Sequence, residues 1–316
     1  MMELVFLDKK TVGEVGNFNL LHKLGNVTVY DHTNQEEIIE RSEGKEVVIT
    51  NKVVINREIM DALPDLKLIC VSATGTNNVD LDYAREKGIQ VKNVSGYSTE
   101  SVAQSAFAML LHLLNRISYY DAYVKSGAYA KGKIFTHHGP AFWEMNGKRM
   151  GIVGLGNIGR RVAKIAEGFG MEVVFYSTSG RNNNINYKRF DLETLLSTSD
   201  VVSIHAPLSE STRNLISYKK FKLMRPCAIV LNTGRGGIIN EADLARALNE
   251  NLIAAAGIDV LEDEPIRPDN PLLKVVDKER ILITPHMAWA SIESRSRLIE
   301  GVARNIEQFN QDRVKS

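Results

Sequence analysis

The chain has 316 residues, more than one ordinary hydrophobic core accommodates, so we expect two domains. Hydrophobic residues make up 44% of the chain and charged residues 24%, with a formal net charge of +1, as in an ordinary globular protein. That balance argues against a protein that binds nucleic acid or a membrane surface. No apolar run approaches the roughly 20 residues of a membrane span, and MMELVFLDKK lacks a signal-peptide pattern. We therefore expect a cytoplasmic protein.

The two cysteines, Cys70 and Cys227, both lie in apolar runs typical of strands. We interpret them as buried structural thiols. Neither belongs to a CxxC pair, and no group of side chains has the spacing of metal ligands, so no metal site is expected.

The first hundred residues alternate short apolar runs with helical patterns. Strands are expected at 4–8, 27–30, 47–50, 66–73 and 89–94, and helices at 17–24, 36–41 and 81–87. The segment 53–55 is also rich in Val and Ile. Strands that alternate with helices predict a parallel, doubly wound sheet.

A long apolar helix and an aromatic segment follow. Residues 101–114 are hydrophobic on nearly every face of the expected helix, which predicts that it packs between other elements. The segment 115–146 is rich in Tyr, Phe and Trp and has little periodicity, so we expect an irregular arm. It forms either a subunit interface or a lid over the chain's own core, and the pattern does not decide between them.

The alternation then starts again, which places a domain boundary near residue 99. Strands are expected at 149–154, 172–176, 201–205, 228–232, 254–260 and 281–284, and helices at 158–169, 192–196, 218–224, 241–248 and 292–309. Six strands with intervening helices fit a dinucleotide-binding sheet.

A glycine motif, GLGNIG, lies between the first of these strands and its helix. Gly154 is placed to make the tight turn, Gly156 to admit a pyrophosphate against bare backbone, and Gly159 to let helix and strand approach closely. The phosphates would meet the unpaired N–H groups at the start of the helix. We assign Asn157 and Ile158 to the same cofactor site.

The end of the next strand bears on the choice of cofactor. A carboxylate there would bind the adenosine ribose and repel a 2′-phosphate, but the chain has Ser177, Thr178 and Arg181 instead. Hydroxyls and a guanidinium suit a phosphate. We therefore predict that NADPH is accepted, while NAD is not excluded.

Three polar side chains follow three separate apolar runs: Arg235 in NTGRGG, Glu264 in EDEP and His286 in TPHMAWAS. Ligands of open parallel sheets bind beyond the carboxyl ends of the strands, so we expect the three to converge on one crevice. A guanidinium holds a carboxylate by two parallel hydrogen bonds. An imidazole moves a proton at neutral pH, and a carboxylate partner orients it. These three residues are our candidate catalytic groups.

Other strand ends complete the predicted site. The remaining cofactor candidates are His205, Pro207, Thr233 and Asp259, of which Asp259 is suited to bind the nicotinamide amide. Free N–H groups at Thr74 and Gly75 are candidates for a small nest that binds the substrate carboxylate. We also assign Arg235, His286 and Trp289 to the substrate site.

Taken together, these motifs resemble the D-isomer-specific 2-hydroxyacid dehydrogenase family, in its glycerate dehydrogenase or hydroxypyruvate reductase branch. The matching pieces are ATGTNNVD, NVSGYSTESVAQ, GIVGLGNIGRRVA, SDVVSIHAPLSEST, LNTGRGGIINEADL, AGIDVLEDEP and TPHMAWAS. The resemblance implies a Rossmann cofactor domain at 100–287, inserted in a flavodoxin-like substrate domain at 1–99 plus 288–316. It also implies a homodimer held together by the arm and the long helix.

The resemblance and the site residues point to NAD(P)H-dependent reduction of a small 2-oxo acid, such as glyoxylate or hydroxypyruvate, to the D-2-hydroxy acid. One alternative is a short phosphoglycerate dehydrogenase. Another is a non-catalytic protein that senses dinucleotides, similar to the family's corepressor relatives. The sequence does not name the physiological acid or the direction of the reaction in the cell.

Overall fold

The computed structural model describes residues 1–182 and 184–315. The chain divides into two compact units. Unit 1 is Met1–Ser98 with Trp289–Ser316, and unit 2 is Thr99–Ala288. These limits differ by one residue from the expected domain boundaries at 99/100 and 287/288. No helix of the described segments is long and apolar enough to cross a membrane.

Unit 1 is built on a five-stranded parallel sheet with strand order β2-β1-β3-β4-β5. Its strands are β1 (Met2–Phe6), β2 (Gly25–Val29), β3 (Val47–Thr50), β4 (Leu68–Val71) and β5 (Gln90–Asn93). Its α-helices are α1 (Asn19–His22), α2 (Ile38–Ser42), α3 (Arg57–Ala62), α4 (Leu81–Glu86) and α11 (Ile292–Lys315). This order is that of flavodoxin-like folds, as expected.

Helices cover both faces of this sheet. Apolar side chains of α1 and α11 pack on one face, and those of α2, α3 and α4 pack on the other. The C-terminal helix therefore belongs to the core of unit 1, although about 190 residues of unit 2 separate it from the rest of that unit in sequence.

Unit 2 contains a seven-stranded parallel sheet with strand order β12-β11-β10-β9-β6-β7-β8. The strands are β6 (Arg149–Val153), β7 (Glu172–Tyr176), β8 (Lys188–Arg189), β9 (Val201–Ile204), β10 (Ile229–Asn232), β11 (Ala255–Ile258) and β12 (Ile281–Ile283). The strand order turns at β6, where the connections switch direction, and this is the place at which dinucleotides bind in such sheets.

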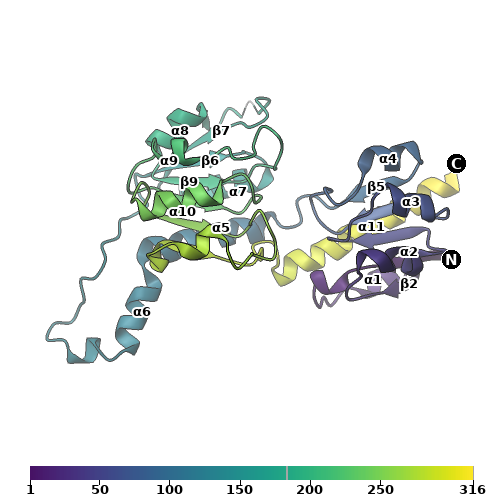
Figure 1. Cartoon of the computed structure of the whole chain (residues 1–316), viewed down its shortest axis with the longest axis horizontal. Helices are drawn as coiled ribbons and strands as arrows, with labels where there is room; N and C mark the ends of the chain where they lie inside the picture. Colours follow the sequence, from purple (N-terminus) through teal and green to yellow (C-terminus); the bar gives the residue numbers. More distant parts are fainter. Residues whose placement is uncertain (183, 316) are drawn as a thin grey trace. The chain divides into compact units, whose positions relative to one another are not determined.

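The helices of unit 2 form a layer on each face of its sheet (Figure 1). They are α5 (Thr99–Asn115), α7 (Asn157–Gly168), α8 (Leu192–Thr198), α9 (Tyr218–Phe221) and α10 (Glu241–Asn249), whereas α6 (Ile117–Lys125) lies outside these layers. Side chains of α5 and α7 pack on one face, and side chains of α8, α9 and α10 pack on the other. The expectation that the long apolar helix is packed between elements is confirmed, because α5 lies against α7, β10 and β11.

The arm at 115–146 is more regular than we expected. It begins with the nine-residue helix α6, which projects from the rest of unit 2 (Figure 1). None of the residues of α6 is buried. The alternative of a lid over the chain's own core is therefore wrong for this helix.

Four other expectations differ from the structure. Cys70 is buried, but Cys227 is exposed and lies two residues before the first residue of β10. The Val- and Ile-rich segment 53–55 forms only an isolated bridge, between Ile55 and Val79. The patterns missed α3 and the two-residue edge strand β8, which are too short to give a clear periodicity.

Candidate active site

The glycine motif makes the turn from β6 into α7, and each glycine has a distinct environment. Gly154 has φ +92°, and a Cβ there would lie 2.9 Å from Ala206 Cα. A Cβ at Gly159 would lie 2.4 Å from the carbonyl oxygen of Gly154, so only glycine lets helix and strand approach this closely. Around Gly156, in contrast, nothing lies within 4 Å of an added Cβ.

This geometry fits a dinucleotide. Gly156 is the N-cap of α7 and offers no side chain to cap the first N–H groups of the helix. Those groups and the open space above Gly156 suit a pyrophosphate, which the N-terminal end of the helix also favours electrostatically. Asn157 and Ile158 lie in the first turn of the same helix, and Asn157 Oδ1 accepts a 2.6 Å hydrogen bond from Arg160.

A turn follows β7 at the position expected to meet the adenosine ribose. Ser177 is buried, and its Oγ accepts a hydrogen bond from the backbone N–H of Asn182. The Asn182 side chain donates a 2.7 Å hydrogen bond to the carbonyl of Leu155, in the glycine motif. The sequence reasoning missed this role of Asn182, for which the run of asparagines gave no signal. Thr178 is half-buried, and Arg181 is exposed.

Polar side chains follow four neighbouring strands in one register row. Ile204, Asn232, Ile258 and Ile283 are paired across β9, β10, β11 and β12. The next residue on each strand is His205, Thr233, Asp259 or Thr284, and we call these four residues the polar row. Since side chains alternate along a strand, all four point to the same face of the sheet, the one covered by α5 and α7. Pro207 lies just beyond this row and is exposed.

The Arg235 loop follows β10. The glycines that flank Arg235 lie close to the backbone of neighbouring segments. A Cβ at Gly236 would lie 1.8 Å from the carbonyl oxygen of Leu261, and one at Gly234 would lie 3.0 Å from that of Ala206. The glycines therefore let this loop approach the ends of both neighbouring strands.

The side chain of Asn232 holds the Arg235 loop by two hydrogen bonds. It is 2% exposed, donates a 2.9 Å hydrogen bond to the carbonyl of Arg235, and accepts one from the N–H of Gly234. The sequence reasoning did not single it out. The Arg235 guanidinium donates to the Gly234 carbonyl through Nη1, and no other bond of this guanidinium occurs within the described ranges. Its remaining N–H groups are available to a ligand.

His286 and Glu264 are brought together as expected. His286 Nδ1 lies 2.6 Å from Glu264 Oε2. The other carboxylate oxygen of Glu264 accepts a hydrogen bond from the N–H of Leu261. The imidazole side chain is 24% exposed, and among the described residues the ring makes its hydrogen bond through Nδ1. A carboxylate on one nitrogen fixes the ring and leaves the other free to move a proton.

The position of His286 depends on Asp259. This carboxylate is 1% exposed and accepts hydrogen bonds from Thr284 Oγ1 at 2.5 Å, from Met287 N at 2.9 Å and from Ala288 N at 3.0 Å. His286 itself has the left-handed φ of +53°, which is unfavourable for a residue with a Cβ. Asp259 therefore stabilises the turn that carries the imidazole, a role that the sequence did not predict.

His205 differs from His286 although both follow a strand. Its Nε2 lies 2.8 Å from Ser203 Oγ and its Nδ1 lies 3.2 Å from Thr233 Oγ1, so hydroxyls rather than a carboxylate surround the ring. Burial lowers the pKa of His205 to about 3. This imidazole is neutral at physiological pH and does not act as the acid.

Three candidates lie in unit 1. Thr74 follows β4, and its hydroxyl donates to the carbonyl of Val94. The N–H groups of Thr74 and Gly75 make no hydrogen bond with any part of the chain that the structure describes, which is consistent with an anion nest. Trp289 is half-buried on the core of this unit, with its ring at 74° to that of Tyr97 and the centroids 6.1 Å apart.

Comparison with known proteins identifies the family of the chain. Residues 107–288 match the family described as "D-isomer specific 2-hydroxyacid dehydrogenase, NAD binding domain". The chain belongs to this family. A hydroxypyruvate reductase from Blautia hydrogenotrophica is 39% identical over 294 residues, which cover 92% of this chain and 90% of the relative. A glycerate dehydrogenase from Methylorubrum extorquens is 36% identical, over 97% of this chain and 96% of the relative.

A solved structure of another protein is similar to this chain over nearly its whole length. An acyclic imino acid reductase in complex with NADPH and D-Arg superimposes with a TM-score of 0.88 at 29% identity, over 98% of each chain. The resemblance predicted from the motifs is thus confirmed, and this member of the dehydrogenase family carries its NAD(P)-binding domain. The described residues include no group of three His, Cys, Asp or Glu side chains able to hold a metal ion.

The neutral state of His205 predicts a pH dependence of stability. Its folded pKa of about 3 lies below the unfolded value of about 6.5, so between these values the unfolded chain binds one more proton. Stability should therefore fall as the pH decreases below about 6.5, by up to about 1.4 kcal/mol per pH unit from this residue. In His205→Asn this contribution is absent.

Thermal unfolding measured at about pH 7 and about pH 5 tests this, with His22→Asn as the control because His22 is exposed in unit 1. The parent and the control should lose more Tm on acidification than His205→Asn. Equal losses in all three proteins would contradict a buried neutral imidazole.

Proposed function

We propose that this dehydrogenase reduces a small 2-oxo acid of the glyoxylate or hydroxypyruvate class with NAD(P)H, to the D-2-hydroxy acid where the product is chiral, and catalyses the reverse oxidation. The His286–Glu264 pair carries this proposal, because a 2.6 Å contact between an imidazole and a carboxylate provides a fixed proton donor. The names of the hydroxypyruvate reductase and the glycerate dehydrogenase support the substrate class.

Each of the three catalytic candidates has one task. Bound reduced nicotinamide supplies a hydride for the carbonyl carbon. His286 donates a proton to the carbonyl oxygen as the C–O bond becomes an alcohol, and Glu264 compensates the charge of the imidazolium form. Arg235 holds the substrate carboxylate with the N–H groups that its own loop leaves free. Thr74, Gly75 and Trp289, which belong to unit 1, stay predicted substrate residues.

Substrate reduction is tested by following the absorbance of reduced nicotinamide with a panel of 2-oxo acids that includes 3-phosphohydroxypyruvate. We expect turnover of glyoxylate or hydroxypyruvate. His286→Ala should lower kcat by about 100- to 10,000-fold, the usual contribution of a general acid. Arg235→Ala should chiefly raise KM, and Arg235→Lys should restore only part of it because an ammonium lacks the fork of two parallel donors.

Two results would count against this proposal. Preference for the phosphorylated acid would favour the short phosphoglycerate dehydrogenase. Cofactor binding without oxidation on any 2-oxo acid would favour a dinucleotide-sensing protein.

We further propose that NADPH is accepted at the turn after β7. Support comes from the absence of a carboxylate at Ser177, and from the exposed Arg181, whose guanidinium forms no hydrogen bond or ion pair with the described part of the chain. The Asn182 bridge to Leu155 holds this turn beside the glycine motif. A 2′-phosphate there would meet hydroxyls and a positive charge.

The measurement is kcat/KM with NADPH and with NADH for the parent, Arg181→Ala, and the control Arg304→Ala on α11, whose arginine is also exposed. Arg181→Ala should lower the value for NADPH by about tenfold, the effect of one charge-assisted hydrogen bond, and change that for NADH little. A strong NADH preference that survives Arg181→Ala would contradict the proposal.

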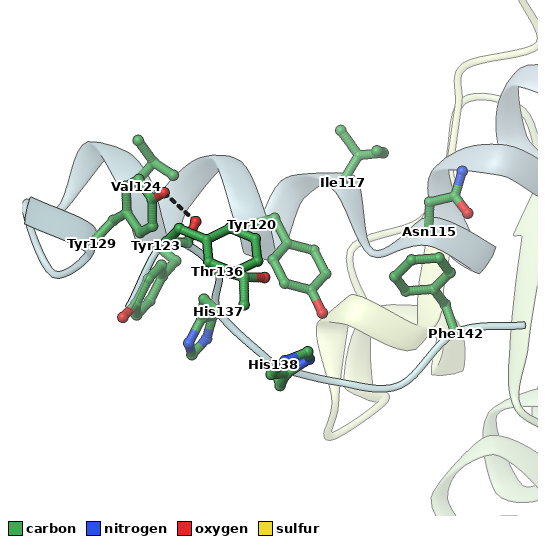
Figure 2. Close-up of a pocket in the computed structure, with 11 residues that line it drawn as sticks. Asn115, Ile117, Tyr120, Tyr123, Val124, Tyr129, Thr136, His137, His138 and Phe142 are labelled. Atoms are coloured by element: carbon green, nitrogen blue, oxygen red, sulfur yellow. Dashed lines mark hydrogen bonds between the residues drawn. The ribbon is translucent and has the colours of Figure 1, made fainter. Parts of the chain in front are cut away.

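We propose that a second copy of the chain covers the arm and makes a homodimer. Large apolar side chains of the arm are exposed, with Phe135 at 90%, Ile134 at 65% and Phe142 at 57%. Figure 2 shows how aromatic and histidine side chains of α6 and the returning chain line one hollow, of about 720 Å³. An apolar patch of this kind typically marks an interface. The arm is therefore our candidate for the dimer interface.

The cytoplasmic location expected from the sequence stays a prediction.

Sedimentation tests the dimer. The double variant Phe135→Glu/Phe142→Glu should sediment as a monomer, because it places two charges in the interface core. Val276→Glu, at an 82% exposed apolar residue outside the arm, should remain a dimer like the parent. A parent that sediments as a monomer would contradict the proposed dimer.

A further inference from the structure

The turn that carries His286 ends at Ala288, the last residue of unit 2. His286 has the left-handed φ of +53°, and a residue with a Cβ keeps such a backbone only where surrounding contacts hold it. Asp259 holds the turn on one side, through the N–H groups of Met287 and Ala288. Ala288 is 1% exposed, so its carbonyl needs a hydrogen-bond donor from the protein.

Two serines of α5 are donors to this carbonyl. Ser101 Oγ donates to the Ala288 oxygen at 2.6 Å, and Ser105 Oγ donates to the same oxygen at 3.3 Å. The two serines are four residues apart, so their hydroxyls lie on one face of the helix. Ser101 is 7% exposed, which leaves little access for water to compete for its hydroxyl. The shorter bond, from Ser101, is therefore the main contact.

The position of α5 depends on a glycine of β11. A Cβ at Gly257 would lie 3.2 Å from Met109 Cβ, so the absence of a side chain at Gly257 lets the helix approach the sheet closely. Met109 follows Ser101 and Ser105 at the same interval of four residues, and it therefore belongs to the same face of α5. This face runs along β11 and β12 to the turn beyond them, where the two hydroxyls reach Ala288.

Ala288 is thus held at both of its backbone polar groups. Its N–H donates to Asp259 at 3.0 Å, and its carbonyl accepts from Ser101. These contacts fix the peptide groups on both sides of Ala288, and with them the path of the chain after His286. The imidazole of His286 lies 2.6 Å from Glu264 through Nδ1. A change at Ser101 can therefore reach the imidazole through two residues of backbone.

We propose that Ser101 is a positioning residue for the proton donor. Its hydroxyl holds the Ala288 carbonyl, which keeps the left-handed turn at His286 in place and the imidazole against Glu264. Ser105 supports the same contact from the next turn of α5. This inference rests on the proposed role of His286 in the reduction. Because Ser101 acts through the backbone of the turn, its loss should slow proton transfer and leave the binding of both reactants nearly unchanged.

Steady-state kinetics with NAD(P)H and the 2-oxo acid test this role. Ser101→Ala should lower kcat about tenfold, because even a small misplacement of a reacting group slows a reaction this much. The KM values for the acid and the cofactor should each change less than about twofold, since neither reactant loses a contact. Ser101→Thr keeps the hydroxyl and should restore most of kcat. Ser105→Ala removes only the longer bond and should lower kcat less than Ser101→Ala.

Ser199→Ala is the matched control. The Ser199 hydroxyl is also buried and donates to a backbone carbonyl, that of Leu195 at 2.7 Å. Ser199 precedes β9, however, so it lies at the opposite edge of the sheet from the strand ends that carry the site. This variant should lose about as much Tm as Ser101→Ala and keep the kcat of the parent. Equal losses of kcat in the two variants, or an unchanged kcat in Ser101→Ala, would overturn the positioning role.

Proton NMR of the whole protein gives a readout that needs no turnover. A carboxylate only accepts, so His286 Nδ1 carries the hydrogen that Glu264 binds, and a hydrogen in so short a bond resonates far downfield. The signal is assigned by its loss in His286→Ala. It should move upfield or broaden in Ser101→Ala and persist in Ser101→Thr and Ser199→Ala. An unchanged signal in Ser101→Ala would show that this serine does not position the imidazole.

These outcomes separate the two proposals. If the parent reduces none of the 2-oxo acids and the downfield signal still depends on Ser101, the proposed function fails while the effect of Ser101 on the imidazole stands. If the parent reduces a 2-oxo acid and Ser101→Ala keeps both kcat and the signal, the positioning role is wrong and the proposed reaction stands.

Discussion

The parallel register of the sheet in unit 2 is the constraint on which the site depends. Backbone hydrogen bonds pair β9, β10, β11 and β12, so the residues that follow these strands stand in one row on one face. A slip of one residue would turn each of those side chains to the opposite face. The backbone thus sets the spacing of His205, Thr233 and Asp259, and the side chains contribute only their chemistry. A further row member, Thr284, donates to Asp259 and so connects the row to the turn that carries His286.

His286 and His205 both follow a strand of the same sheet, but they have different neighbours. His286 lies against the carboxylate of Glu264, whereas His205 lies between the hydroxyls of Ser203 and Thr233. Glu264 holds the His286 ring by a hydrogen bond, while burial among neutral groups lowers the pKa of His205 and favours its uncharged form. His286 is therefore suited to move a proton, and His205 is suited to hold one in place. The sequence places both rings at the same edge, but their roles are set by neighbours from other strands.

Much of the fold was predictable because strong periodicity persists along the chain. The strand at 172–176 has the limits of β7, and the glycine motif predicted the turn into α7. The pairing of Glu264 with His286 was also predictable, since both follow strands of a parallel sheet. What the sequence could not provide are contacts between side chain and backbone across strands, such as those of Asn232 and Asp259. It also could not show that Cys227 stands just outside its strand, because one residue of offset separates burial from exposure.

The close approach at Gly236 restricts which residue can occupy this position. Backbone, rather than side chain, meets backbone there: an added Cβ would lie 1.8 Å from the Leu261 carbonyl oxygen. The segments that bear the guanidinium and the acid–imidazole pair are consequently locked to each other, and no mutation at this glycine can loosen them gradually. A side chain at position 236 would therefore have to push the Arg235 loop and the segment around Leu261 apart before it could be accommodated.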